Sequence, residues 1–177
     1  MGRNPLKRMP QVLIVGDEGT GKTTLAIGES LKELEPTQGY NRFEKCLHDS
    51  ETGKIVSIWD VSGNEILKPL WSAYYKNIFF SGVIYVIDSN SINYEKSIKD
   101  IHFLVNEEEL RDAAFLILFN MKGTKKEVTG RKGSELSLLL KGDEIHTSTK
   151  INYFEFNFKG YDQTAKNAFT WLEENMN

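Results

Sequence analysis

Short apolar runs alternate along this chain with amphipathic segments. The runs Val12–Val15, Val83–Ile87 and Phe115–Phe119 are continuously apolar or aromatic, which is typical of strands buried on both faces of a parallel sheet. Over Tyr94–Val105 and Thr164–Met176, apolar residues recur instead at helical spacing. Strands that alternate with amphipathic helices predict an α/β fold, in which helices cover both faces of a mainly parallel sheet.

Further strands and a first helix complete this pattern. The extended runs Arg42–Leu47 and Lys54–Trp59 predict a β-hairpin at the edge of the sheet, because the residues between them favour turns: Asp49, Ser50, Thr52 and Gly53. Phe154–Phe158 alternates like a last strand, so we expect a six-stranded sheet. A helix from Lys22 to about Leu34 is expected before the hairpin, because Pro36 stops it there.

Length and cysteine content narrow the class of protein. The 177 residues suit a single domain, 1–177, with residues 1–10 as a short N-terminal tail. Gly123–Lys150 is polar and matches no element. Cys46 has no second cysteine for an intrachain disulfide, and no secretory signal starts the chain, so we expect a cytoplasmic protein. No apolar run approaches the ~20 residues of a membrane-spanning helix.

Charge argues against one class of partner. The net charge of -3 disfavours general nucleic-acid binding, because such proteins cluster Lys and Arg to neutralise phosphates. Arg3, Lys7 and Arg8 form one basic cluster, which we interpret as a solvated tail, with contact to anionic lipid as the alternative. The myristoylation motif would need Ser or Thr where Leu6 stands, so acylation of Gly2 has no support.

The clearest motif follows the first strand. Gly16–Thr23 reads G-D-E-G-T-G-K-T and matches G-x-x-x-x-G-K-[ST], the P-loop, at every fixed position. Its glycines let backbone N–H groups approach a phosphate, and the helix after it presents its N-terminus to the same anion. We expect Lys22 to contact the β- and γ-phosphates of a nucleoside triphosphate and the Thr23 hydroxyl to bind Mg²⁺. The expected phosphate-binding residues are Gly16, Asp17, Glu18, Gly19, Thr20, Gly21, Lys22, Thr23 and Thr24.

A second acidic motif, Asp60–Gly63, follows the predicted strand Lys54–Trp59. Ligands of open α/β sheets collect at this end of the strands, so we expect Asp60 to hold the Mg²⁺ through water. Asp and Gly also end strands in ordinary turns. The P-loop elsewhere in the chain is what favours the magnesium interpretation.

These residues resemble the Arf and Arf-like branch of the small GTPases, from about Val12 to Asn175. Six segments carry the resemblance: G-D-E-G-T-G-K-T-T-L, P-T-Q-G-Y-N, W-D-V-S-G-N, P-L-W-S-A-Y-Y, V-I-D-S-N and E-E-L-R-D-A. The resemblance implies the small-GTPase form of the P-loop NTPase fold. It also implies GTP or GDP with Mg²⁺ as ligands, and a switch that recruits protein effectors.

The resemblance assigns further roles. It makes Thr37 the switch I residue that completes the Mg²⁺ shell when a γ-phosphate is present, and Gly63 the switch II residue whose backbone N–H contacts that phosphate. Loss of the γ-phosphate would then release both segments. Effectors and regulators are expected at switch I (Thr37–Asn41), at Trp59 and at switch II (Ser62–Tyr75). The family has an aromatic triad to which partner proteins bind, and it is matched here by Tyr40, Trp59 and Tyr74. Packing in the core is the alternative interpretation of these three residues.

Two motifs depart from the family in ways that affect catalysis and base choice. Where the family has Gly-Gly-Gln to orient the attacking water, this chain has Ser62, Gly63 and Asn64. Asn is one methylene shorter than Gln, and a misplacement of about 1 Å can cost ~10²-fold in rate. We therefore expect slow GTP hydrolysis, with Asn64 and Gly63 as the catalytic residues and an activating partner that supplies an arginine.

At the base-recognition motif, Asn120-Met121-Lys122-Gly123 stands where the family has Asn-Lys-x-Asp. Gly123 lacks the carboxylate that accepts two guanine N–H bonds, so guanine specificity loses its main determinant. A shifted motif at Thr124–Glu127 is the alternative. The residues expected beside the base are Asn120, Lys122, Phe158 and Lys159, the last two in place of the family's Ser-Ala-Lys.

Three hypotheses follow for function. The leading one is an Arf-like GTP-binding switch. The alternative, motivated by Asn64, Met121 and Gly123, is a pseudo-GTPase that holds nucleotide as a structural subunit of a larger assembly. A metabolic P-loop kinase is disfavoured because the chain has no arginine-rich lid. The fifteen residues before Gly16 do not form the amphipathic helix by which Arf proteins bind membranes, so peripheral membrane contact by that route has no support.

GTP with Mg²⁺ is expected to raise the unfolding temperature, because a ligand that binds only the native state stabilises it by mass action. The measurement is a thermal unfolding scan with GTP, with ATP and with neither, each with and without Mg²⁺. Equal shifts with GTP and ATP would remove the guanine prediction. No shift with either nucleotide would remove the triphosphate prediction.

Overall fold

The computed structural model describes residues 9–28, 36–47, 53–91, 94–121, 149–157 and 163–177. The elements in these ranges, in chain order, are β1 (Gln11–Val15), α1 (Lys22–Ile27), β2 (Tyr40–Cys46), β3 (Ile55–Val61), η1 (Lys68–Leu70), α2 (Trp71–Tyr75), β4 (Gly82–Asp88), α3 (Tyr94–Val105), η2 (Glu108–Leu110), β5 (Ala114–Asn120), β6 (Ile151–Phe156) and α5 (Gln163–Asn175). The elements η1 and η2 are single 3₁₀ turns.

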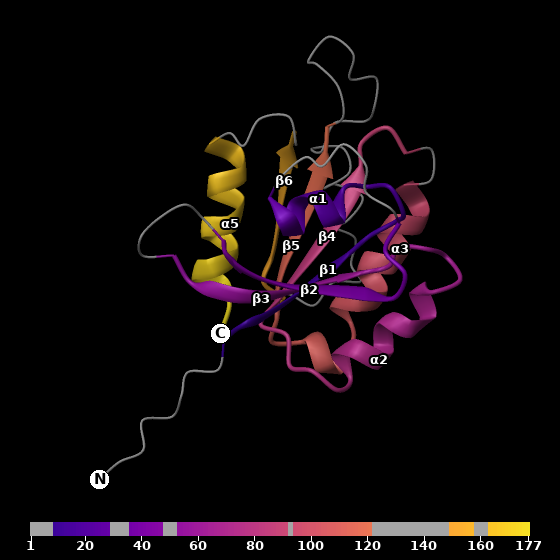
Figure 1. Cartoon of the computed structure of the whole chain (residues 1–177), viewed down its shortest axis with the longest axis horizontal. Coiled ribbons are helices and arrows are strands. Elements are labelled where there is room, and N and C mark those ends of the chain that lie inside the picture. Colours follow the sequence, from indigo (N-terminus) through magenta and orange to yellow (C-terminus); the bar gives the residue numbers. More distant parts are fainter. Residues whose placement is uncertain (1–8, 29–35, 48–52, 92–93, 122–148, 158–162) are drawn as a thin grey trace.

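The strands form one six-stranded sheet in the order β2-β3-β1-β4-β5-β6 (Figure 1). The pairs β1–β3, β1–β4, β4–β5 and β5–β6 are parallel, whereas β2 and β3 pair antiparallel at one edge. This arrangement confirms the predicted mainly parallel sheet with an antiparallel edge pair. It places β1 in the middle of the sheet, so that the loop after β1 lies between the ends of β3 and β4.

Helices cover both faces of the sheet, and two hydrophobic clusters result. On one face, side chains of α1 and α5, such as Leu25 and Phe169, pack against residues of the central strands that include Ile14 and Leu116. On the other face, α2 and α3 pack against the alternate residues of the same strands. Figure 1 shows α5 on one side of the strands and α2 and α3 on the other. The continuous apolar runs in the sequence are explained by this two-sided burial.

Several element boundaries differ from the sequence prediction. The last strand, predicted as Phe154–Phe158, is β6 at Ile151–Phe156, and β2 begins at Tyr40 rather than Arg42. Two further differences concern the site. The helix predicted to reach Leu34 instead ends at Ile27, because Gly28 adopts a left-handed conformation (φ +83°) and its N–H bonds to the Thr24 carbonyl. Residues 29–35 lie outside the described ranges. The strand predicted to end at Trp59 continues to Val61, which pairs with Tyr40. Asp60 therefore lies within β3 rather than after it.

Several predictions fall on residues that the structure does not describe. They concern most of the N-terminal tail, the turn of the predicted hairpin at 49–52, and the polar segment that begins at Gly123. Among the described residues, no helix has the length and apolar character needed to cross a bilayer.

Candidate functional site

The P-loop contacts two neighbouring strands of the sheet, β4 and β5. Gly16 has a φ of +139°, and a Cβ at this position would lie 2.3 Å from the Val86 carbonyl oxygen of β4. Only glycine lets the chain turn this close to the neighbouring strand. From the end of β5, the buried Asn120 donates its side-chain N–H to the Thr20 carbonyl at 2.8 Å. Thr20 in turn donates its hydroxyl to the Asp17 carbonyl at 3.0 Å.

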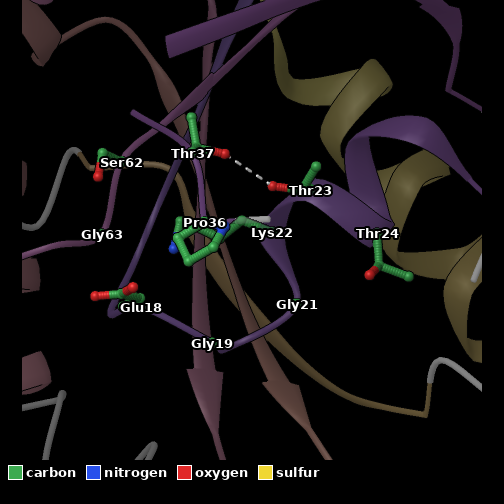
Figure 2. A pocket seen from close by; sticks show the side chains of 10 residues that line it. All are labelled: Glu18, Gly19, Gly21, Lys22, Thr23, Thr24, Pro36, Thr37, Ser62 and Gly63. Carbon is green, nitrogen blue, oxygen red and sulfur yellow. Dashed lines mark hydrogen bonds between the residues drawn. The ribbon is translucent and has the colours of Figure 1, made fainter. Parts of the chain in front are cut away.

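A pocket of about 310 Å³ opens beside this loop (Figure 2). It brings together the P-loop, the start of switch I and the start of switch II, which are far apart in the sequence. The residues that line it are Glu18, Gly19, Gly21, Lys22, Thr23, Thr24, Pro36, Thr37, Ser62 and Gly63.

Two hydroxyls and one carboxylate converge at one side of the pocket. Thr23 donates its hydroxyl to Asp60 Oδ2 at 2.6 Å, and Thr37 donates to the same oxygen at 3.3 Å. The two threonine hydroxyl oxygens are 3.2 Å apart (Figure 2). Magnesium prefers oxygen ligands and is commonly held by one or two carboxylates together with substrate phosphates. The three residues predicted as magnesium ligands are thus brought together.

The burial of the Asp60 carboxylate also favours a bound cation. Its side chain is fully buried, and Oδ1 has no hydrogen-bond partner among the described residues. Burial raises the pKa of Asp60, although the hydrogen bonds from Thr23 and Thr37 and the charge of Lys22 act in the opposite direction. The carboxylate is therefore incompletely compensated within the protein, and a divalent cation beside it would supply the missing charge.

Lys22 supplies the positive charge of the phosphate side. It is only 6% exposed, and its ammonium donates to the Asp17 carbonyl at 2.6 Å. Burial lowers the pKa of Lys22 to about 8, against the opposing effects of Asp60 and Asp17. The ammonium is thus mostly protonated at pH 7 and lacks full compensation. A bound phosphate would restore this charge balance and raise the pKa again.

Gly63 lies directly on the P-loop. A Cβ at Gly63 would be 2.3 Å from the Gly16 carbonyl oxygen and 2.5 Å from the ammonium of Lys22. No other residue fits without moving the P-loop backbone. Next to it, Ser62 joins the two switches, because its N–H bonds to the Gly39 carbonyl at 2.8 Å.

Asn64, the predicted catalytic residue, is engaged in local contacts. Its amide nitrogen donates to Glu18 Oε2 at 3.4 Å, and its amide oxygen accepts from the Ile66 N–H at 3.0 Å. Asn64 does not line the pocket. In this arrangement the amide bonds to the start of switch II and to a P-loop residue that lines the pocket.

The structure sorts the predicted site residues into three groups. Eight line the pocket: Glu18, Gly19, Gly21, Lys22, Thr23, Thr24, Thr37 and Gly63. Six support it without lining it: Gly16, Asp17, Thr20, Asp60, Asn64 and Asn120. Three lie outside the described residues: Lys122, Phe158 and Lys159.

Sequence reasoning missed two pocket residues and the role of one side chain. Pro36 and Ser62 line the pocket through their places beside Thr37 and Gly63, so adjacency to predicted site residues was the available signal. Asp17 was predicted to bind phosphate, but its carboxylate turns to Lys68 and Ser97. Met121, which replaces the family's lysine, packs against the core cluster of α2 and α3.

The three predicted triad aromatics also meet. Tyr40 stacks on Trp59 with ring centroids 5.1 Å apart and meets Tyr74 edge-on at 5.4 Å. Trp59 reaches inward to Phe80 at 6.2 Å, whereas Tyr40 is 49% exposed. The cluster therefore belongs partly to the core and partly to the surface.

Comparison with known proteins agrees with this geometry. A sequence model of the ADP-ribosylation factor family (Arf) matches residues 3–176. Among solved structures, that of the Arl6 BBS3 small GTPase from Trypanosoma brucei, with the bound nucleotide analogue GppNp, superposes with a TM-score of 0.75 at 23% identity. The match covers 94% of this chain and 96% of that one. At this identity the likeness concerns the fold, and it confirms the small-GTPase fold class.

Asp60→Asn is expected to weaken Mg²⁺ binding by about 10- to 100-fold, because the amide keeps an oxygen for Thr23 but loses the charge that attracts the cation. The measurement is the part of the GTP-induced rise in unfolding temperature that depends on Mg²⁺. Asp112→Asn is the matched control, since the Asp112 side chain is 63% exposed and remote from the pocket. An unchanged Mg²⁺ dependence in Asp60→Asn would contradict the assignment.

Proposed function

Because the chain belongs to the ADP-ribosylation factor family, we propose that it is a GTP-binding regulatory switch with slow intrinsic hydrolysis. The observation that carries the proposal is the convergence of Thr23, Thr37 and Asp60 beside the ammonium of Lys22. A cation site next to a phosphate site is the arrangement that a magnesium nucleotide needs.

Each residue of the pocket then has a role in binding. Lys22 contacts the β- and γ-phosphates, and the P-loop backbone surrounds the β-phosphate. Thr23 and Thr37 bind Mg²⁺ through their hydroxyls, and Asp60 holds it through water. The cation, when bound, neutralises phosphate charge. Gly63 places its backbone N–H at the γ-phosphate, which its close approach to Lys22 supports.

A nucleotide-dependent change is expected because the bound ligand would contact two segments of the chain besides the P-loop. Thr37 belongs to switch I and Gly63 to switch II, and both reach the pocket from outside the P-loop. A γ-phosphate with Mg²⁺ gives both segments a shared partner, and its loss removes that partner. Effectors would bind at switch I, at Trp59 and at switch II, where Tyr40 and its aromatic neighbours present an exposed edge.

Base choice and domain organisation are further parts of the proposal. Asn120 binds the P-loop carbonyl of Thr20, which leaves its remaining polar atoms for the base. Lys122, Phe158 and Lys159 are proposed as base contacts on the family resemblance alone. We also propose that 1–177 is a single domain, since the family match extends over 3–176.

A specific observation favours a second candidate. The amide of Asn64 already bonds to Glu18 and to the Ile66 N–H. An amide engaged in this way has fewer donor and acceptor sites left for a water molecule, so hydrolysis would be slow or absent. A pseudo-GTPase that keeps its nucleotide as a fixed subunit of an assembly would have this property.

The experiment that tests the proposal is identification of the nucleotide that copurifies with the protein, by denaturation and chromatography. We expect a guanine nucleotide. GDP would support a cycling switch and GTP the fixed subunit. ATP or ADP would overturn the guanine assignment, and absence of nucleotide together with no binding of added GTP would overturn the function.

Asn64→Gln is expected to speed single-turnover hydrolysis of bound GTP by up to about 10²-fold, because the longer amide reaches the attacking water. The measurement is release of phosphate from preloaded protein. Asn106→Gln is the matched control, since Asn106 is exposed at the end of α3. An unchanged rate in Asn64→Gln would show that this position does not limit hydrolysis.

A further inference from the structure

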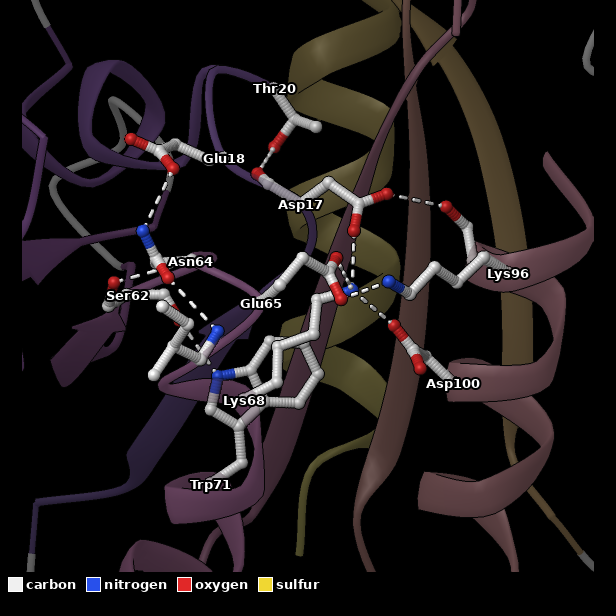
Figure 3. A network of polar contacts seen from close by, with 12 residues as sticks. Asp17, Glu18, Thr20, Ser62, Asn64, Glu65, Lys68, Trp71, Lys96 and Asp100 are labelled. Carbon is white, nitrogen blue, oxygen red and sulfur yellow. Dashed lines mark hydrogen bonds and ion pairs between the residues drawn. The ribbon is translucent and has the colours of Figure 1, made fainter. Parts of the chain in front are cut away.

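Lys68, in switch II, is surrounded by three carboxylates (Figure 3). Its ammonium donates to Asp17 Oδ1 of the P-loop and to Asp100 Oδ2 of α3, the latter at 2.6 Å. It also lies 3.2 Å from Glu65 Oε1, one turn earlier in switch II. The Lys68 side chain is only 9% exposed. A lysine with so little exposure is ordinarily found paired, as this one is.

The carboxylates that hold Lys68 are themselves held. Ser97 donates its hydroxyl to Asp17 Oδ2 at 2.9 Å, and Tyr85 donates to Asp100 Oδ2 at 3.1 Å. Tyr85 belongs to β4, and Ser97 and Asp100 belong to α3. The network therefore joins switch II to three parts of the rigid fold: the P-loop, a central strand and a helix.

The same lysine is coupled to the backbone beside the pocket. Its ammonium lies 5.5 Å from the centre of the Trp71 ring. Trp71 is buried and donates its indole N–H to the Ser62 carbonyl at 2.9 Å. Ser62 immediately precedes Gly63, which lies on the P-loop against Lys22. A continuous set of contacts thus connects Lys68 to the position of Gly63.

Lys68 and Asp17 keep their charges across the physiological pH range. Burial alone would lower the pKa of Lys68, but hydrogen bonds and charge from Asp100 and Asp17 raise it above its ordinary value. Burial alone would raise the pKa of Asp17, but Lys68 and Ser97 lower it below its ordinary value. Both groups of the Lys68–Asp17 ion pair are therefore charged at neutral pH.

We propose that Lys68 is a positioning residue that tethers switch II to the P-loop through Asp17, so that Gly63 stays against Lys22 with or without a γ-phosphate. None of Lys68, Asp17 and Asp100 lines the nucleotide pocket, so none of their contacts is made through a group bound there. Thr37 of switch I has hydrogen bonds only to Thr23, Asp60 and Asn41 among the described side chains.

The two switches then respond unequally to nucleotide. Thr37 of switch I is ordered chiefly by the ligand, whereas switch II is ordered in advance by the protein. This part of the inference rests on the proposed function, because it concerns the γ-phosphate. The tether itself does not, because it acts in the protein without nucleotide.

Backbone hydrogen exchange of full-length protein tests the tether, read by mass spectrometry on peptides within 62–75 and around Thr37. The states compared are nucleotide-free, GDP with Mg²⁺, and a non-hydrolysable GTP analogue with Mg²⁺. In the wild type, exchange within 62–75 is expected to vary by less than about twofold among the states, while exchange around Thr37 slows with the analogue. A change of about tenfold or more within 62–75 would overturn the proposal.

Lys68→Met removes the ammonium and keeps an unbranched side chain of similar length. It is expected to raise exchange within 62–75 by about tenfold or more in the nucleotide-free and GDP states, and to make that exchange dependent on the analogue. Exchange in β4 and β5 is expected to stay at the wild-type level, which a general loss of stability would not allow. Unchanged exchange within 62–75 in Lys68→Met would overturn the proposal.

Three further variants provide a control, a conservative replacement of Lys68 and a substitute for Lys68→Met. Lys96→Met is the matched control, because Lys96 pairs with Glu65 at the exposed rim and its side chain is 41% exposed; no loosening is expected. Lys68→Arg is expected to keep switch II protected, since a guanidinium can donate to both Asp17 and Asp100. If Lys68→Met does not fold, Asp100→Asn replaces it, and wild-type protection there would overturn the proposal.

Failure of the proposed function has a different outcome. Protein that binds no guanine nucleotide but still loosens within 62–75 in Lys68→Met would retain the tether and lose the switch. Protein that binds GTP but shows no effect of Lys68→Met would retain the switch and lose the tether.

Discussion

The burial of two opposite charges at the carboxyl end of the central strands is the constraint on which the site depends. Lys22 and Asp60 both lie below the surface, because β1 pairs with β3 in a register that sets Ile14 opposite Asp60. Neither charge is fully compensated within the described residues, as the shifted pKa values of both groups indicate. Buried charges that the protein compensates only in part favour a ligand that carries both positive and negative charge. A magnesium nucleotide would be such a ligand, because it combines a cation with phosphates.

The same constraint explains the tight fit around the P-loop. Gly16 approaches β4 and Gly63 approaches the P-loop so closely that a Cβ at either position would meet a backbone oxygen at 2.3 Å. Close backbone contact excludes water and keeps N–H groups near the place of the phosphates. Asn120 adds a side-chain bond from β5 to the loop. These contacts hold the P-loop backbone in place within the protein, and a site arranged in advance lowers the cost of binding a ligand.

Switch I and switch II, the two segments beside the pocket, differ in the contacts that attach them to the rest of the fold. Lys68 gives switch II a buried ionic attachment to Asp17 and Asp100, whereas Thr37 of switch I contacts mainly the residues that would hold the cation. A buried ion pair within the protein persists without ligand, while contacts through a cation do not. Asn64, the residue predicted to be catalytic, contacts Glu18 of the P-loop at 3.4 Å.

The sequence by itself determined the α/β class and the P-loop, because periodicity and short motifs are local properties of the chain. It also predicted Thr23 and Asp60 as magnesium ligands from motifs, and Thr37 from the family resemblance. It also indicated the six strands, although the first helix is shorter than Pro36 suggested because Gly28 ends it. Only the tertiary structure decided where the carboxylate of Asp17 points and which groups hold Lys68. Asp17 and Lys68 are 51 residues apart in sequence. They meet only because strand order and helix packing bring the P-loop, switch II and α3 together. Contacts of this kind depend on register and layer geometry, which no local pattern of residues records.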